Sequence, residues 1–185
     1  TTNMDSPKIT TLGELKRTDY KSESIQQELA RNLRHRLSNG LSTFDGLIGY
    51  ENTVIPDIER ALLSGHNINL LGLRGQAKTR IARQMTELLN EWSPIVDGSE
   101  INDCPLSPIS QEAKELISKK GEQTPIKWLH RHDRFFEKLA TPDVTVADLI
   151  GDVDPIKAAN LRLSYADERV IHFGMIPRAH RCIFV

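Results

Sequence analysis

The segment spanning residues 67–82 constrains this chain most, because it joins an apolar stretch, a glycine-bearing turn and a helical stretch in the order that a phosphate-binding loop requires. It fits the pattern G-x-x-x-x-G-K-[ST] with one departure, since Ala77 stands at the second glycine position. Gly72 and Gly75 let the backbone approach phosphate oxygens closely, whereas Ala77 requires its position to tolerate a Cβ. The sequence therefore predicts a strand, a phosphate-binding loop and a helix. An ordinary strand-to-helix connection is the alternative.

The residues of this loop match the chemistry of a nucleoside triphosphate. Such a ligand needs converging backbone N–H groups, a flexible cation and a hydroxyl group for magnesium. Lys78 would neutralise the β and γ phosphates and Thr79 would bind Mg²⁺, so we expect these two residues to be catalytic and ATP and Mg²⁺ to be the cofactors. The residues expected to contact the nucleotide are Gly72, Leu73, Arg74, Gly75, Gln76, Ala77, Lys78, Thr79 and Arg80.

The segments that flank the loop extend the pattern. A G-L-I-G run at 46–49 precedes a helical stretch at 54–62, and A-L-L-S-G-H at 61–66 leads into the apolar stretch. This arrangement resembles the MoxR and magnesium-chelatase I-subunit group of AAA+ ATPases, which commonly carries alanine before the lysine. The resemblance implies an α/β P-loop NTPase core with a parallel sheet flanked by helices. It also implies that Ile48, Gly49 and Tyr50 border the adenine.

The second half of the chain is similar to the same group. Residues 141–154 resemble the exit from the second strand and the second helix, and residues 174–185 resemble the segment that enters the Walker B strand. By resemblance, the acidic residues that hold magnesium and polarise water would follow Val185. We therefore expect a truncated core, the N-terminal part of a longer protein, that would be inactive as an ATPase by itself. A complete chain with a merely terminal strand is the alternative.

Composition and charge exclude several classes of protein. With 24 basic against 25 acidic residues, the net charge of −1 gives no electrostatic reason to expect nucleic acid as a partner. No apolar run approaches the roughly 20 residues that span a bilayer, and two cysteines in unrelated contexts indicate free thiols in a reducing compartment. We expect a cytoplasmic protein with no membrane partner.

Two regions are expected along the chain. The first is an N-terminal leader and helix (1–40), and the second is, by resemblance, a partial AAA+ domain (41–185) with an insertion around 101–135. Residues 1–21 predict a loose leader, and the capping-box pair Ser24 and Gln27 predicts a helix over 24–38. Within the insertion, the sequence predicts a helix over 110–120 and then a turn around Trp128 and Leu129.

The alternation between Leu161 and Phe173 predicts a hairpin whose strands contain Leu163, Tyr165 and Val170. The resemblance implies that this hairpin engages a partner or substrate. An exposed hairpin without a role is an equal alternative.

A metal site is a further possibility in the insertion, because His130 and His132 lie close in sequence and Cys104 precedes them. Two histidines two positions apart face the same way only on a strand, no second ligand pair has suitable spacing, and Arg131 would repel a cation. A solvated polar turn is favoured.

The resemblance implies an ATP-hydrolysing remodelling motor, either a MoxR chaperone or a chelatase motor. It would assemble as a homo-oligomeric ring, a hexamer by resemblance, and act on a protein client or a von Willebrand A-type partner. One alternative is a nucleotide-dependent scaffold or regulator that binds ATP without turnover. Another is a small-molecule kinase, which the G-L-I-G segment argues against.

Overall fold

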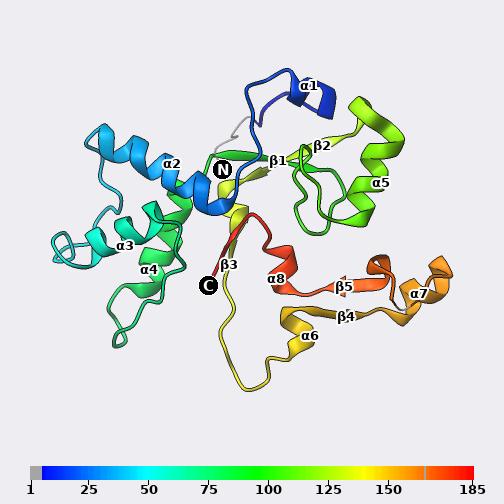
Figure 1. The fold of residues 1–185 in the computed structure, drawn as a ribbon. Coiled ribbons are helices and arrows are strands. Elements are labelled where there is room, and N and C mark those ends of the chain that lie inside the picture. Colours follow the sequence, from blue (N-terminus) through cyan, green and yellow to red (C-terminus); the bar gives the residue numbers. More distant parts are fainter. Residues whose placement is uncertain (1–5, 165) are drawn as a thin grey trace.

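The computed structural model describes residues 6–164 and 166–185, which form a mixed α/β structure (Figure 1). The α-helices are α1 (Leu12–Lys16), α2 (Ile25–Ser38), α3 (Val54–Leu63), α4 (Lys78–Gln84), α5 (Gln111–Lys120), α6 (Val146–Leu149), α7 (Pro155–Leu161) and α8 (Met175–Arg178). The strands are β1 (Trp92–Val96), β2 (Ile126–His130), β3 (Phe135–Phe136), β4 (Gly151–Val153), β5 (Ile171–Phe173) and β6 (Ile183–Phe184). Short 3₁₀ helices are η1 (Met85–Leu88), η2 (Gly121–Gln123), η3 (Arg131–Arg134) and η4 (Glu168–Val170). No helix in this described part is long and apolar enough to cross a membrane.

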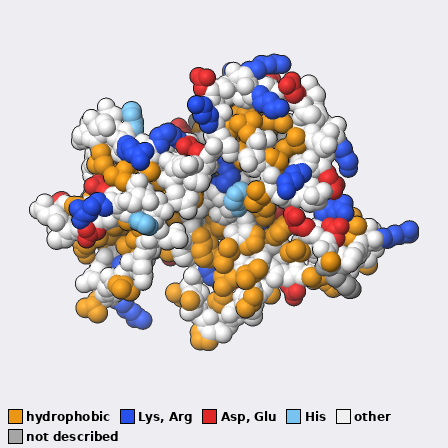
Figure 2. All heavy atoms as spheres, in the orientation of Figure 1, with side chains coloured by type: hydrophobic (Ala, Val, Ile, Leu, Met, Phe, Trp, Pro, Cys, Tyr) orange, Lys and Arg blue, Asp and Glu red, His pale blue; other side chains and the backbone are white. Residues whose placement is uncertain are grey.

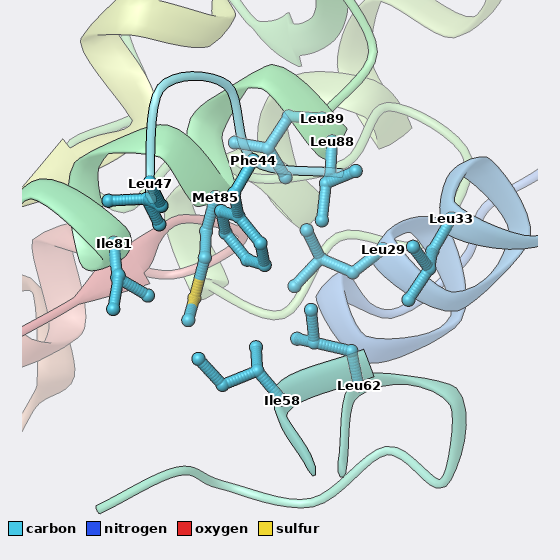
Figure 3. Packing of buried hydrophobic residues seen from close by; sticks show 10 residues of the cluster. All are labelled: Leu29, Leu33, Phe44, Leu47, Ile58, Leu62, Ile81, Met85, Leu88 and Leu89. Carbon is cyan, nitrogen blue, oxygen red and sulfur yellow. The ribbon is translucent and has the colours of Figure 1, made fainter. Parts of the chain in front are cut away.

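Helices α2, α3 and α4 form one lobe around the main apolar core (Figures 1 and 3). The predicted capping box begins α2: Ser24 Oγ accepts from the Gln27 amide at 3.2 Å, and Gln27 Oε1 accepts from the Ser24 amide at 2.9 Å. The predicted helices at 24–38 and 54–62 are confirmed. Their apolar faces meet those of α4, η1 and the preceding loop, and the buried residues are Leu29, Leu33, Phe44, Leu47, Ile58, Leu62, Ile81, Met85, Leu88 and Leu89.

The sheets are smaller than the predicted parallel core. Only β3 and β6 pair in parallel among the described strands, through two residues each, whereas β1–β2 and β4–β5 are antiparallel. The apolar strand predicted before the loop does not form a ladder, because the backbone groups of residues 67–71 have no partner in the described part of the chain. Ile68 and Leu70 are nevertheless half-buried while Asn69 is exposed, so the side chains keep the alternation of a strand.

The N-terminal segment docks on β2 and on the residues just before it, so the prediction of a loose leader is wrong for the described residues from 6 onward. Leu12 and Leu15 of α1 are buried, and the Leu12 amide donates to the Thr124 carbonyl at 2.9 Å. The turn predicted around Trp128 is also wrong, because this residue lies in β2 and its indole donates to the Ile9 carbonyl at 2.7 Å. These pairings join residues more than 100 positions apart, which local sequence does not specify.

The predicted helix at 110–120 is confirmed as α5, and Ser110 caps it. The buried Asp103 carboxylate accepts from Ser110 Oγ and from the amides of Ser110 and Ile109, and also from Ser99 Oγ. Burial raises the pKa of Asp103, but these hydrogen bonds outweigh it and hold the pKa below its ordinary value. These hydrogen bonds therefore stabilise the fold at pH values above the ordinary pKa of aspartate. This stabilisation is lost as the pH falls through the pKa of Asp103 in the folded protein.

An arm built from α6, β4, α7, β5 and α8 replaces the hairpin predicted between residues 161 and 173. Leu161 ends α7 instead of lying in a strand, and β5 pairs with β4, so the predicted strand partners were wrong. Tyr165, assigned to that hairpin, lies outside the described residues. The Asp154 side chain caps α7 through the amides of Ile156 and Lys157, which favours a helix over the predicted strand.

One buried ion pair connects α2 to the centre of the molecule. Arg134 and Glu28 are joined by two parallel hydrogen bonds of 2.7 Å, and their side chains are 1% and 5% exposed. Glu28 also accepts from the Asn90 amide at 2.8 Å, and Arg134 donates to the Arg181 carbonyl at 2.7 Å. The pair therefore ties together α2, the segment between η1 and β1, η3 and the segment before β6.

Replacing Arg134 with Met should destabilise the fold by about 3–5 kcal/mol, because the Glu28 carboxylate would remain buried without its partner. The double variant Glu28→Gln/Arg134→Met should be more stable than Arg134→Met alone, since the introduced glutamine would still accept from Asn90 without carrying a charge. Urea unfolding followed by circular dichroism measures both. A double variant no more stable than the single one would contradict this interpretation.

Candidate functional site

The predicted phosphate-binding loop connects the segment after α3 to the N-terminus of α4 (Figure 1). The departure from the sequence pattern has a structural meaning, because Ala77 has φ +54° and ψ +13°, the left-handed conformation that a glycine adopts freely. Gly75 also has positive φ, at +82°, and a Cβ there would meet open space. Ala77 thus adopts the backbone geometry expected of the glycine in the pattern, despite its Cβ.

Lys78 lies over the loop that precedes it. Its Nζ donates to the Gly72 carbonyl at 2.8 Å and to the Leu73 carbonyl at 2.5 Å. An ammonium group has three N–H donors, so one donor remains for a ligand. The cation is therefore already held at the loop.

The backbone amides of the loop are free to bind an anion. Among the described contacts, the N–H groups from Arg74 to Arg80 have no acceptor, and the first amide of α4 to be paired is that of Ile81, which donates to the Ala77 carbonyl at 2.9 Å. Consecutive amides without acceptors, together with the Lys78 ammonium on the same loop, are the groups from which a cradle for phosphate oxygens is built. The residues present therefore fit the phosphates of a nucleotide.

Two cavities meet at Lys78. One, of about 310 Å³, lies between α3 and the loop and is lined by Tyr50, Val54, Ile58 and Gln76 as well as Lys78. Its size and apolar wall suit the base and sugar of a nucleotide. The other, of about 530 Å³, opens between residues 67–70 and 182–185 and also reaches Thr79.

The structure brings some of the predicted site residues to the loop and not others. Tyr50 contacts it, because its hydroxyl donates to the Gln76 carbonyl at 3.4 Å, whereas Ile48 is 90% exposed. Gly49 lies in the same turn and donates its amide to Glu51 at 2.8 Å.

The side chains within the loop point in different directions. Arg80 donates to the Asp45 carbonyl at 3.2 Å, so its guanidinium lies away from the cradle. Arg74 and Thr79 are exposed, and Leu73 is 77% exposed. Thr79 follows Lys78 at the start of α4, where an exposed hydroxyl could serve as a magnesium ligand.

Sequence reasoning missed the side-chain role of Gln76 and the cavity wall formed by Val54 and Ile58. Gln76 Oε1 accepts from the Leu73 amide at 2.9 Å, inside the loop. The helical period of Val54 and Ile58 indicates a buried face but not that this face borders a cavity. No sequence signal distinguishes Gln76 from an exposed loop residue.

The histidines weighed as metal ligands make contacts of another kind. His130 packs edge-to-face against Trp92 with ring centroids 4.9 Å apart, and its Nδ1 accepts from the His132 amide at 3.3 Å. His130 ends β2 and is partly buried, so it does not lie in a fully solvated turn. Across residues 6–164 and 166–185, no three His, Cys, Asp or Glu side chains lie close enough to hold a metal ion together. Both cysteines are buried and free, and burial raises the pKa of Cys182 to about 11.

Comparisons of this chain with protein-family models, curated proteins and solved structures found no match.

The conformation of Ala77 predicts opposite effects for two substitutions. Ala77→Gly should keep nucleotide binding, with an unfolding free energy within about 1 kcal/mol of wild type, because the relief of left-handed strain offsets the added chain entropy. Ala77→Val should destabilise by more than about 1 kcal/mol, since a β-branched residue tolerates positive φ poorly. Urea unfolding and calorimetric titration with MgATP test the pair. Equal tolerance of Gly and Val would refute the left-handed assignment.

Proposed function

We propose that this chain binds ATP with Mg²⁺ at the loop 72–79 and belongs to an ATP-hydrolysing remodelling motor of the MoxR or magnesium-chelatase type. The observation that carries the proposal is the cradle of unpaired amides beside the ammonium of Lys78. Thr79 would supply a magnesium ligand, and the apolar cavity beside Tyr50 would take the adenosine. The spacing of the loop and its flanks supports the family assignment.

The proposed motor would act on a protein client or a von Willebrand A-type partner from a homo-oligomeric ring in the cytoplasm. Exposed apolar side chains on the arm support a protein partner, since large apolar patches commonly mark interaction surfaces. Figure 2 shows hydrophobic side chains gathered over the region of α6 and α8. The most exposed members along the arm are Val146, Ile150, Ile156, Leu161 and Ile176.

The second candidate function is a scaffold or regulator that binds ATP without turnover, and an altered Walker B segment would favour it. Asp57 is the one acidic side chain among the described residues that line the two cavities at Lys78. Hydrolysis of ATP normally requires a carboxylate that holds magnesium or orients the attacking water. The two functions share the binding site and differ in turnover.

Lys78→Ala should reduce MgATP binding below detection while leaving the fold intact. The ammonium meets the phosphates directly, whereas exposed charge contacts of a lysine seldom contribute more than about 1 kcal/mol to folding. Isothermal titration calorimetry gives the affinity and circular dichroism gives the fold. Lys120→Ala, at the exposed end of α5, is the matched control and should bind as wild type does. Undiminished binding by Lys78→Ala would remove the phosphate-binding assignment.

The 185-residue chain should bind MgATP and release phosphate no faster than background, because the cradle supplies ground-state contacts without a placed carboxylate. Phosphate release would be measured over a range of protein concentrations, with Lys78→Ala as the control for contaminating ATPases. Turnover that rises with protein concentration and is lost in Lys78→Ala would contradict this expectation and favour an assembled motor.

A further inference from the structure

We propose that the Gln76 side chain is a positioning residue of the phosphate-binding loop, because it fixes the orientation of the peptide group that holds Lys78. The inference rests on the proposed nucleotide site and assigns a role within it. Gln76 acts through Lys78 and is not itself expected to touch the reacting atoms.

Two side chains hold the peptide group between Gly72 and Leu73 from opposite ends. Its carbonyl accepts from Lys78 Nζ at 2.8 Å, and its N–H donates to Gln76 Oε1 at 2.9 Å. If this peptide group flipped, its N–H would face the Lys78 ammonium, and the positive end of the N–H dipole would be repelled by the ammonium charge. By accepting the N–H, Gln76 favours the orientation in which the carbonyl faces Lys78.

The loop is shaped to admit the Gln76 carboxamide. A Cβ on Gly72 would lie 2.2 Å from Gln76 Oε1, so a side chain at position 72 would displace the carboxamide. The Tyr50 hydroxyl donates to the Gln76 carbonyl and links this residue to the turn before α3. Gln76 also borders the cavity beside Tyr50, so a packing effect of its replacement should weaken ATP and AMP alike, whereas loss of its hydrogen bond should weaken ATP more.

A fixed peptide orientation favours nucleotide binding by keeping Lys78 over the cradle. The carbonyls of Gly72 and Leu73 take two of the three donors of the ammonium, which leaves one directed donor for phosphate. A side chain held in this way loses less conformational freedom when the ligand binds. Loss of one neutral hydrogen bond should weaken binding about threefold to tenfold. The loss should be larger for ATP and ADP, whose phosphates reach Lys78, than for AMP.

The test compares Gln76→Met, which keeps the length but removes the acceptor, with Gln76→Glu, which keeps an acceptor oxygen. Gln123→Met, an exposed glutamine in η2, controls for the substitution itself. Displacement of a fluorescent ATP analogue by ATP, ADP and AMP with Mg²⁺ gives the affinities. The ¹⁵N–¹H resonance of Leu73 reports the hydrogen bond without nucleotide, and thermal melting checks the fold.

In Gln76→Met, we expect a roughly threefold to tenfold higher Kd for ATP, a smaller change for AMP and a shifted Leu73 resonance. Gln76→Glu should return that resonance towards its wild-type position, and Gln123→Met should change nothing. Suppose that the wild-type protein binds the nucleotides. An unchanged Kd in Gln76→Met, or equal losses of affinity for ATP and AMP, would then overturn only the positioning role of Gln76. Failure of the wild-type protein to bind any of the three nucleotides would instead remove the proposed function.

Discussion

The buried pair of Glu28 and Arg134 is the interaction on which the placement of the α2–α3–α4 lobe against the rest of the described chain depends. A carboxylate and a guanidinium withdrawn from water are stable only when each meets several partners, and Asn90 and the Arg181 carbonyl supply them here. Arg181 extends the network, because its guanidinium donates to the Pro94 carbonyl and to Ser93 Oγ at 2.8 and 2.7 Å. Helix α2, strand β1 and the segment before β6 are thereby fixed relative to one another.

The sequence predicted the helices whose capping residues lie within a few positions, and it missed the strands that depend on partners elsewhere in the chain. The capping residues Ser24 and Ser110 gave correct helix starts, because a cap is decided within four residues. The pairing of β5 with β4, and the docking of residues 9–12 on β2, depend on partners far along the chain. The antiparallel β1–β2 pair likewise cannot be read from a pattern of alternation, because residues 97–125 lie between its strands and β2 itself lies within the predicted insertion.

The candidate site shows the same division. The spacing alone predicts Lys78, Thr79 and the glycines of the loop as site residues, since a phosphate cradle is formed by consecutive residues. The cavity wall at Val54 and Ile58 and the contact from Tyr50 depend on how α3 packs against the loop, which the core around Ile58 and Ile81 determines. Gln76 was predicted only as a loop residue that contacts the nucleotide. Its side-chain hydrogen bond to the Leu73 amide was missed, because any exposed polar residue could make or lack such a bond.

The loop keeps its conformation without support from a sheet, and this bears on its energetics. Residues 67–71 contribute the inward side chains Ile68 and Leu70 to the core, but their backbone pairs with no described strand, and Leu71 is 86% exposed. Side-chain contacts from Lys78 and Gln76 therefore carry much of the order in the loop. A segment with few backbone hydrogen bonds opens at a low free-energy cost, and any ligand that binds its closed form stabilises that form by mass action. Occupancy of the cradle and order in residues 67–79 are consequently linked, because the ammonium of Lys78 both holds the loop and would meet the phosphates.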